Sequence, residues 1–323
     1  MKELPLPDKG TVILPVPGIK FSWTVNFSII GVLILLAVLP YFAPYGLAIE
    51  IVIFSLFALS YNILHGHMGQ VSFGHAMFFG LGAYFSGLLS IYFPLPWWAS
   101  WVWLVVGVAA TGVVAMGVGA LVLKKRGAYF ALTNLAFLQI FYFLILQLKG
   151  ITGGDDGRWG VPIVFDLKGI PFYYFTFGIV AVCILIMKRI FTDSPFSLIL
   201  HAIRENEDRV DFSGYNIFRY MLKAYVFSGI FAAIAGGLLA MHLSYMGLSM
   251  LHWSLTGEVI IMSMLGGVAT FIGPMIGAII FITIKDLIAA NTGHWMLILG
   301  IIVMGIILLM RDGILGKIKA LKL

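Results

Sequence analysis

Long apolar runs, separated by short breaks rich in glycine, proline or charge, make up most of the chain. A helix that crosses the hydrocarbon core of a bilayer needs about 20 mostly apolar residues. Read with that length, the runs predict an all-α, polytopic membrane protein with ten spans, of which the eighth and ninth are short. The predicted spans are residues 25–43, 47–65, 75–93, 97–123, 128–148, 170–190, 224–246, 257–267, 271–284 and 294–310.

The composition agrees with this pattern. Hydrophobic residues make up 61% of the 323 residues and charged residues only 11%, whereas a soluble globular protein carries about 25% charged residues. This excludes a soluble domain of any size. We expect a cytoplasmic tail (1–24), a membrane domain (25–310) and a basic cytoplasmic tail (311–323). No cleaved signal peptide is expected, because the first residues lack a basic, apolar and small-residue succession.

The positions of lysine and arginine predict the orientation. With ten spans and both termini in the cytoplasm, 16 of the 20 basic residues fall in cytoplasmic segments. Such an excess is typical of cytoplasmic loops. We therefore expect both termini inside.

The first segment that predicts function is HGHMGQVSFGHAMFFGLG, residues 65–82. Its glycines are too many for an undisturbed helix, since each costs roughly 1 kcal/mol. Irregular backbone at membrane depth survives only in a protein interior or beside a wet cavity. One interpretation is a broken helix beside a substrate path, to which Gly69, Gln70, Ser72, Gly74 and His75 would contribute. The other is close helix packing through small residues.

A second glycine-rich segment, LTGEVIIMSMLGGVATFIGPMIGA, lies in the last third of the chain. Gly266, Gly267, Gly273 and Pro274 interrupt its apolar run, and two such interruptions in opposite halves indicate a transport site between structural repeats. Glu258 could cap a helix start, the interpretation we favour, or contact the ammonium group of a substrate.

Residues 194–214 predict one short amphipathic cytoplasmic helix. Ser194 and Pro195 suit the N-cap and first helical position, Glu205 stands four residues before Arg209, and Gly214 ends the helix. Its charges have mixed signs. The helix could lie on the lipid surface, but the mixed charges favour docking to a protein partner.

A polar loop on the expected outer side contains Thr152, Gly153, Gly154 and Gly157. It could be a lid or a docking surface for an extracytoplasmic protein, or only a loop rich in turns.

Several kinds of chemistry have no motif in the sequence. No phosphate-binding loop of the G-x-x-x-x-G-K-[ST] type is present, so the chain is not expected to hydrolyse ATP by that route. The pair His65 and His67 lacks the carboxylate or cysteine partners of a metal site, and none is predicted. An ion-coupled carrier and an intramembrane enzyme that uses Ser72 and His75 remain as alternatives.

Five motifs carry a family resemblance. They are SYNILHGHMGQVSFGHAMFFGLGAY (60–84), KKRGAYFALTNLAF (124–137), ITGGDDG (151–157), HAIRENEDRV (201–210) and MLGGVATFIGPMIGA (264–278). In this order they resemble the branched-chain amino acid ABC transporter permease family, in its second, longer subunit type. Asn134, within the second motif, joins the candidates for the substrate path. The chain departs from many members at Asp155 and Asp156, where they have Pro with Asn or Asp.

The resemblance implies a non-enzymatic permease of a prokaryotic inner membrane, with branched-chain or related hydrophobic amino acids as substrates. The family also includes permeases for urea and short amides, which the shared motifs do not separate. Expected partners are a second homologous permease, two cytoplasmic ATPases, an extracytoplasmic solute-binding protein and membrane lipid, but no nucleic acid. No cofactor is expected in this chain, because ATP would bind the ATPase subunits. The residues expected to contact the ATPase are Ala202, Ile203, Arg204, Glu205, Asn206, Glu207 and Arg209.

Overall fold

The computed structural model describes residues 23–96, 99–268 and 270–291, together with residues 297, 298, 300, 301, 304 and 305. Its helices are α1 (Trp23–Val38), α2 (Tyr45–Asn62), α3 (Ala76–Tyr92), α4 (Trp101–Val122), α5 (Gly127–Gln147), α6 (Lys149–Thr152), α7 (Ile170–Phe191), α8 (Pro195–Glu205), α9 (Glu207–Phe212), α10 (Ile217–Leu243), α11 (Trp253–Gly266) and α12 (Gly273–Asn291). Two short strands, β1 (Arg158–Trp159) and β2 (Tyr245–Met246), pair antiparallel.

The predicted all-α membrane fold is confirmed. Six described helices are long and apolar enough to cross a membrane: α2 with the turn that follows it, α4, α5, α7, α10 and α12. Shorter apolar helices cover residues 29–41, 76–92 and 253–266. These nine helices match the first nine predicted spans in order. The tenth predicted span, 294–310, lies largely outside the described residues.

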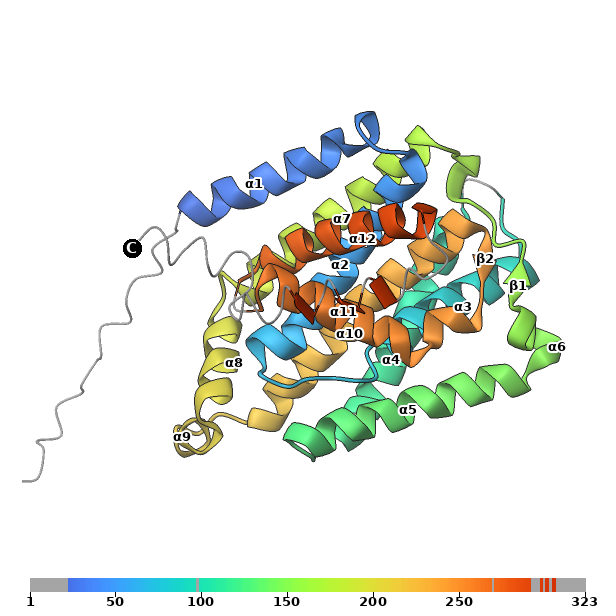
Figure 1. Cartoon of the computed structure of the whole chain (residues 1–323). Coiled ribbons are helices and arrows are strands. Elements are labelled where there is room, and N and C mark those ends of the chain that lie inside the picture. The colour runs from blue at the N-terminus through green and yellow to red at the C-terminus, as the bar shows by residue number, and fades with distance from the viewer. Residues whose placement is uncertain are drawn as a thin grey trace, which may run out of the picture.

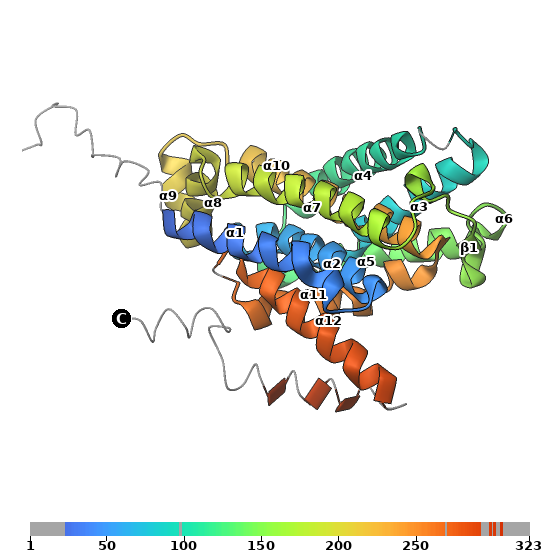
Figure 2. The ribbon, with the colours of Figure 1, turned by 90° about the horizontal axis from the view of Figure 1, so that it is seen from above.

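Helix α2 lies at the centre of the bundle. It contacts α7, α10, α11 and α12, while α10 also packs against α3 and α4 (Figures 1 and 2). Every residue from 51 to 62 is buried. A helix that is apolar on all sides belongs in such an interior position. Any disturbance of α2 therefore reaches most of the bundle.

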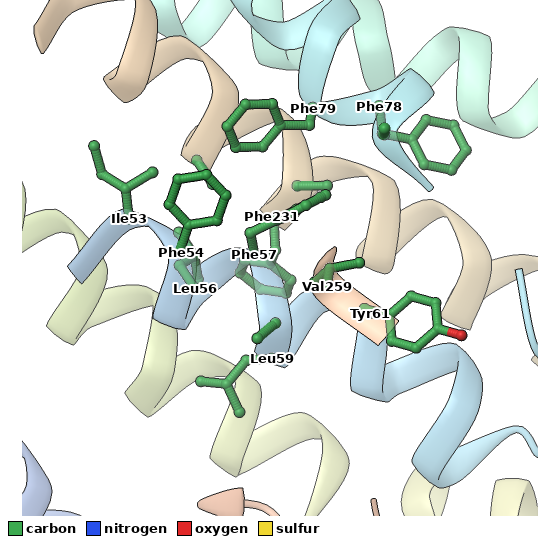
Figure 3. Close-up of a cluster of buried hydrophobic side chains, with 14 of the residues drawn as sticks. Ile53, Phe54, Leu56, Phe57, Leu59, Tyr61, Phe78, Phe79, Phe231 and Val259 are labelled. Carbon is green, nitrogen blue, oxygen red and sulfur yellow. The ribbon is translucent and has the colours of Figure 1, made fainter. Parts of the chain in front are cut away.

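An aromatic cluster joins the central helices (Figure 3). The ring centroids of Phe57 in α2 and Phe79 in α3 lie 4.6 Å apart, and those of Phe54 and Phe79 lie 6.0 Å apart. Phe231 of α10 and Val259 of α11 belong to the same cluster. Each aromatic pair adds about 1 kcal/mol beyond its buried area. The cluster thus holds four helices on one core.

Helices α3 and α10 approach each other backbone to backbone. A Cβ atom on Gly236 would overlap the carbonyl oxygen of Phe79, and one on Gly82 would overlap that of Ala233. Small residues permit such approach between membrane helices. For Gly82, at the end of the first glycine-rich segment, the structure therefore supports the close-packing interpretation.

The polar segments gather at opposite ends of the bundle. Helices α8 and α9 lie at one end, whereas α6, β1 and β2 lie at the other (Figure 1). The two segments that the sequence predicts on opposite sides of the membrane are thus a full bundle length apart.

Candidate translocation and coupling site

Helix α2 breaks at the first glycine-rich segment. Residues Ile63–His67 form a π-helical turn, in which the amide of Met68 donates to the carbonyl of Ile63 at 3.1 Å. The chain then stays non-helical until α3 begins at Ala76. Gly69 adopts a left-handed φ of 71°, which costs glycine no steric strain. The interruption predicted from the glycines is present, while its role in a substrate path stays a prediction.

The polar residues of this segment point to different neighbours. The side-chain oxygen of Gln70 accepts a hydrogen bond from the amide of Gly127, at the start of α5, at 3.0 Å. His75 is fully buried, and its Nε2 lies 2.9 Å from the hydroxyl of Ser60 in α2. Ser72 is also fully buried, and its hydroxyl has no hydrogen-bond partner among the described residues. The structure thus pairs His75 with Ser60 rather than with Ser72, which weakens the enzyme alternative.

Asn134 and Gly74 connect the segment to α5. The side-chain oxygen of Asn134 accepts from the hydroxyl of Tyr225 in α10 at 2.5 Å, and its amide donates to the carbonyl of Phe130 at 2.9 Å. A Cβ atom on Gly74 would overlap the carbonyl oxygen of Asn134. Both residues therefore act as contacts between the broken segment, α5 and α10 in this conformation.

The second glycine-rich segment forms a tight turn between α11 and α12. Helix α11 ends at Gly266, Gly267 follows with a φ of 110°, and α12 begins at Gly273 with Pro274 in its first turn. A Cβ atom on Gly266 would overlap the carbonyl oxygen of Gly273. The interruption is therefore a helix–helix turn and not a bend inside one helix.

The two glycine-rich segments meet. The side-chain amide of Asn62, at the end of α2, donates to the carbonyl of Thr270 at 3.2 Å. A Cβ atom on Gly66 would lie 2.7 Å from the carbonyl oxygen of Val268. The break in α2 and the turn between α11 and α12 thus form one continuous contact, although some 200 residues separate them.

The segment predicted to lie in the cytoplasm consists of two helices, α8 and α9, and the prediction of one helix over residues 194–214 is wrong. The break falls at Asn206, which has extended backbone (φ −161°, ψ 102°). Its side chain accepts from the amide of Arg209 at 3.0 Å and so caps α9. An asparagine side chain offers the backbone this alternative to a continuous helix. Glu205 and Arg209 consequently lie on different helices.

The predicted start of the segment is confirmed, because Ser194 is the N-cap residue of α8. Pro195 occupies the first turn of α8 as expected. The hydroxyl of Ser194, however, donates to the carbonyl of Ile190 and makes no cap hydrogen bond. At the other end α9 stops at Phe212, and Gly214 follows with a left-handed φ of 82°.

Helix α8 packs directly on the break in α2. The guanidinium of Arg204 donates to the carbonyl of Gly66, and the aliphatic stem of Arg204 contacts Gly69. Nε2 of His201 lies 3.1 Å from Nδ1 of His67. Arg204 thus reaches inward from the predicted coupling set, a role that its sequence position did not indicate.

The other residues predicted to contact the ATPase differ in solvent exposure. Ile203 is buried and anchors α8, whereas Ala202, Glu205 and Arg209 are exposed. Glu207 forms an ion pair with Arg126, whose Nε lies 2.8 Å from its carboxylate. This ion pair ties α9 to the turn between α4 and α5.

Glu258 does not cap a helix, and the interpretation that we favoured is wrong. Helix α11 begins at Trp253, and the ring of His252 accepts from the amide of Ser254 at its start. Glu258 lies further along the helix and pairs with Lys285 of α12, Nζ to carboxylate, at 2.8 Å. The ion pair between neighbouring spans explains a carboxylate in this apolar run.

The loop predicted on the outer side, residues 151–157, which we call the outer loop, is held by many local hydrogen bonds. The hydroxyl of Thr152 donates to the carbonyl of Ile145 at 2.7 Å and accepts from the amide of Gly154 at 3.2 Å. A Cβ atom on Gly153 would overlap the carbonyl oxygen of Gly157. The close contacts within the loop therefore explain why glycines occupy these positions. A lid or docking role stays a prediction.

Two grooves follow one another along α5 and α11. The inner groove encloses about 470 Å³ and is mostly apolar. The outer groove encloses about 370 Å³ at the end of the bundle that carries the outer loop, and it is largely polar. The inner groove is lined by Phe73, Leu135, Gln139, Trp253, Thr256, Gly257 and Ile260, and the outer groove by Tyr142, Asp155, Tyr245, Leu248, Ser249, His252 and Ser254.

The grooves contain residues that the sequence reasoning missed. None of the predicted path residues lines either groove, although Phe73 belongs to the first glycine-rich segment. Gln139 could have been noticed as a polar residue inside an otherwise apolar run. The hydroxyl of Thr256 accepts from the amide of Ala76 at 3.0 Å, so the inner groove borders the start of α3.

Comparisons with known proteins agree with this architecture. Residues 43–311 match the family described as branched-chain amino acid transport system / permease component. The high-affinity branched-chain amino acid transport system permease protein LivM of Escherichia coli (strain K12) is 24% identical over 306 residues, which cover 84% of this chain and 70% of the relative. LivM of Salmonella typhimurium (strain LT2) is 24% identical over 307 residues, with the same coverage. No solved structure matches the chain significantly. Because the family match spans most of its length, the chain belongs to the permease components of branched-chain amino acid transport systems.

Proposed function

We propose that this chain is one of two homologous permease subunits of an ATP-driven importer for branched-chain or related hydrophobic amino acids. Two cytoplasmic ATPases would bind and hydrolyse ATP, and an extracytoplasmic binding protein would deliver the substrate. The family membership supports the transport function. The missing phosphate-binding loop supports a separate source of ATP hydrolysis.

The contact of α8 with the break in α2 is the observation that carries the proposal. Arg204, a member of the exposed cytoplasmic segment, hydrogen-bonds the carbonyl of Gly66 inside the π-helical turn. The same turn touches the α11–α12 turn through Val268. A displacement of α8 by an ATPase would therefore be transmitted to both glycine-rich segments. Packed elements pass on such motions as small rigid shifts.

The distribution of basic residues supports one orientation of the chain in the membrane. The end of the bundle that carries α8 and α9 would face the cytoplasm, together with both termini, as the distribution of basic residues supports. Ala202, Glu205, Asn206 and Arg209 are exposed there and would contact an ATPase. The outer loop, including Thr152 and Gly157, would then face the binding protein.

The grooves along α5 and α11 would form this subunit's wall of the translocation path. Helix α5 lies at the margin of the bundle (Figure 1) and exposes large apolar side chains, among them Leu132, Ile140 and Phe143. Both grooves are lined in part by α5 residues, among them Leu135, Gln139 and Tyr142. The second permease would supply the opposite wall, and rearrangement at the glycine-rich segments would open the path at one end or the other.

Reconstitution tests the proposal. Proteoliposomes with both permeases, the ATPases and the binding protein should take up leucine only with internal ATP. The double variant Glu205→Ala/Arg209→Ala should insert normally but lose ATP-driven uptake. Undiminished uptake by that variant would contradict the coupling role. Uptake by this chain alone, driven by an ion gradient, would identify a secondary carrier, and uptake of urea or short amides in place of leucine would refute the substrate class.

A further inference from the structure

We infer that the outer groove is a subsite for the charged head of an amino acid zwitterion, with its ammonium group at Asp155 and its carboxylate at the start of α11. The inference rests on the proposed function and adds a binding site and a substrate orientation to it. The groove lies between three elements: α5, the outer loop and the segment from β2 to α11. This groove is largely polar, whereas the inner groove next to it along α5 and α11 is mostly apolar.

One wall of the groove offers hydrogen-bond donors. Nδ1 of His252 accepts from the amide of Ser254 at 3.3 Å and lies 2.8 Å from its hydroxyl. In the neutral ring the proton then sits on Nε2, which remains a donor for a ligand in the groove that this ring lines. Ser249, which is exposed, lines the same groove and brings a hydroxyl to it. The positive end of the α11 dipole adds to these donors and favours a carboxylate.

The facing wall offers a negative charge. Asp155 lines the groove from the outer loop and is exposed. The main chain next to it is held, because the hydroxyl of Tyr245 donates to the carbonyl of Asp156 at 3.1 Å. The ring of Tyr245 is in turn packed against Trp159, with centroids 4.5 Å apart. A carboxylate on a backbone held in this way suits an ammonium group.

The groove arrangement also orients the rest of the substrate. Trp253 lines the inner groove, while its neighbours in sequence, His252 and Ser254, line the outer groove. The near end of the inner groove, at Trp253, gives the aliphatic side chain of such a substrate an apolar surface. Each groove has the volume typical of a small-molecule site. Urea has neither the opposite charges nor the apolar tail that this arrangement would recognise.

The test compares two adjacent aspartates in the complete importer. Asp155→Asn removes the proposed ammonium partner, whereas Asp156→Asn, the matched control, changes a side chain that does not line the groove. Asp155→Asn should raise the KM for leucine uptake about tenfold, as expected for the loss of one charged hydrogen bond, with a similar maximal rate. Ser249→Ala should raise it less, and Asp156→Asn should leave it unchanged.

The docking of leucine-loaded binding protein to the complex is measured alongside. Unaltered docking with a raised KM supports the subsite. An unchanged KM in Asp155→Asn, an equal effect of Asp156→Asn, or a raised KM that follows weakened docking would overturn the subsite while leaving the proposed function intact. A wild-type complex that takes up no branched-chain amino acid would overturn both.

Discussion

Arg204 donates a hydrogen bond to the main-chain carbonyl of Gly66 and covers Gly69 with its aliphatic stem. A side chain from α8 is thus hydrogen-bonded to the backbone of the central helix at the point where that helix is broken. Arginine suits this position because its guanidinium always carries its charge and presents several donors in a fixed plane.

Arg204→Ala should separate ATP hydrolysis from transport. The variant keeps Ile203 and Leu200, which anchor α8 in the core, but loses the link to the π-helical turn. We expect leucine uptake about tenfold lower, with ATP hydrolysis by the complex at least half preserved. A charged hydrogen bond of about 1.5 kcal/mol accounts for an effect of that size. Uptake and hydrolysis are measured in the same proteoliposomes.

Arg219→Ala is the control for this prediction. Arg219 is an exposed arginine in the first turn of α10, at the same end of the bundle. It should transport normally. If both variants lost uptake equally, the effect would reflect net charge and not the contact with Gly66.

Gly236→Ala should destabilise the bundle much more than Gly117→Ala. The new methyl group at Gly236 would overlap the carbonyl oxygen of Phe79, whereas Gly117 in α4 has open space at that position. Overpacking of this kind costs about 1–3 kcal/mol, while alanine in an open helical position gains up to about 1 kcal/mol. Thermal unfolding in detergent measures the difference. Equal melting temperatures for the two variants would show that α3 and α10 can move apart freely.

The spans were predictable because the bilayer fixes the length of an apolar helix. The pattern of the sequence also locates the break after His67 and the turn at Gly267, since glycines in an apolar run disturb helices. Which segments touch was not predictable in the same way. The contact of Asn62 with Thr270 depends on how α2, α11 and α12 pack, and that information is spread over the whole bundle.

The errors of sequence reasoning have local causes. The spacing of Glu205 and Arg209 favours one continuous helix. The side chain of Asn206, however, caps a new helix at this point and so interrupts the first one. Glu258 follows a Thr-Gly pair that is typical of a helix start, yet its partner Lys285 lies 27 residues away. Local signals cannot identify a partner from another helix.

The ion pair between Glu258 and Lys285 should stabilise the hairpin of α11 and α12. Removing one of the two charges should therefore destabilise the protein more than removing both. Glu258→Gln removes the carboxylate that Lys285 contacts at 2.8 Å, in a region where both side chains are at most about a third exposed. We expect a loss of about 1–2 kcal/mol in the free energy of unfolding, because the pair is only partly buried. The double variant Glu258→Gln/Lys285→Met should recover most of it. A double variant less stable than either single variant would contradict this view.

His201 should make the contact between α8 and α2 sensitive to acid. Its partial burial and the charge of Arg204 hold the pKa of His201 below its usual range, and Glu205 offsets this only in part. Nδ1 of His67 lies 3.1 Å from Nε2 of His201. A proton on both rings would therefore bring two positive charges together.

The sign of the effect follows from linkage. Because the folded-state pKa of His201 is lowered, its contribution to stability is complete above the usual histidine pKa of about 6.5 and is lost as the pH falls through the folded-state pKa. His201→Gln keeps a hydrogen-bonding side chain but removes the titration. The wild type should thus lose more stability than His201→Gln between about pH 7 and about pH 5. The unfolding midpoints of the two proteins are measured across that range in one detergent. If both midpoints changed equally with pH, protonation of His201 would not weaken the contact between α8 and α2.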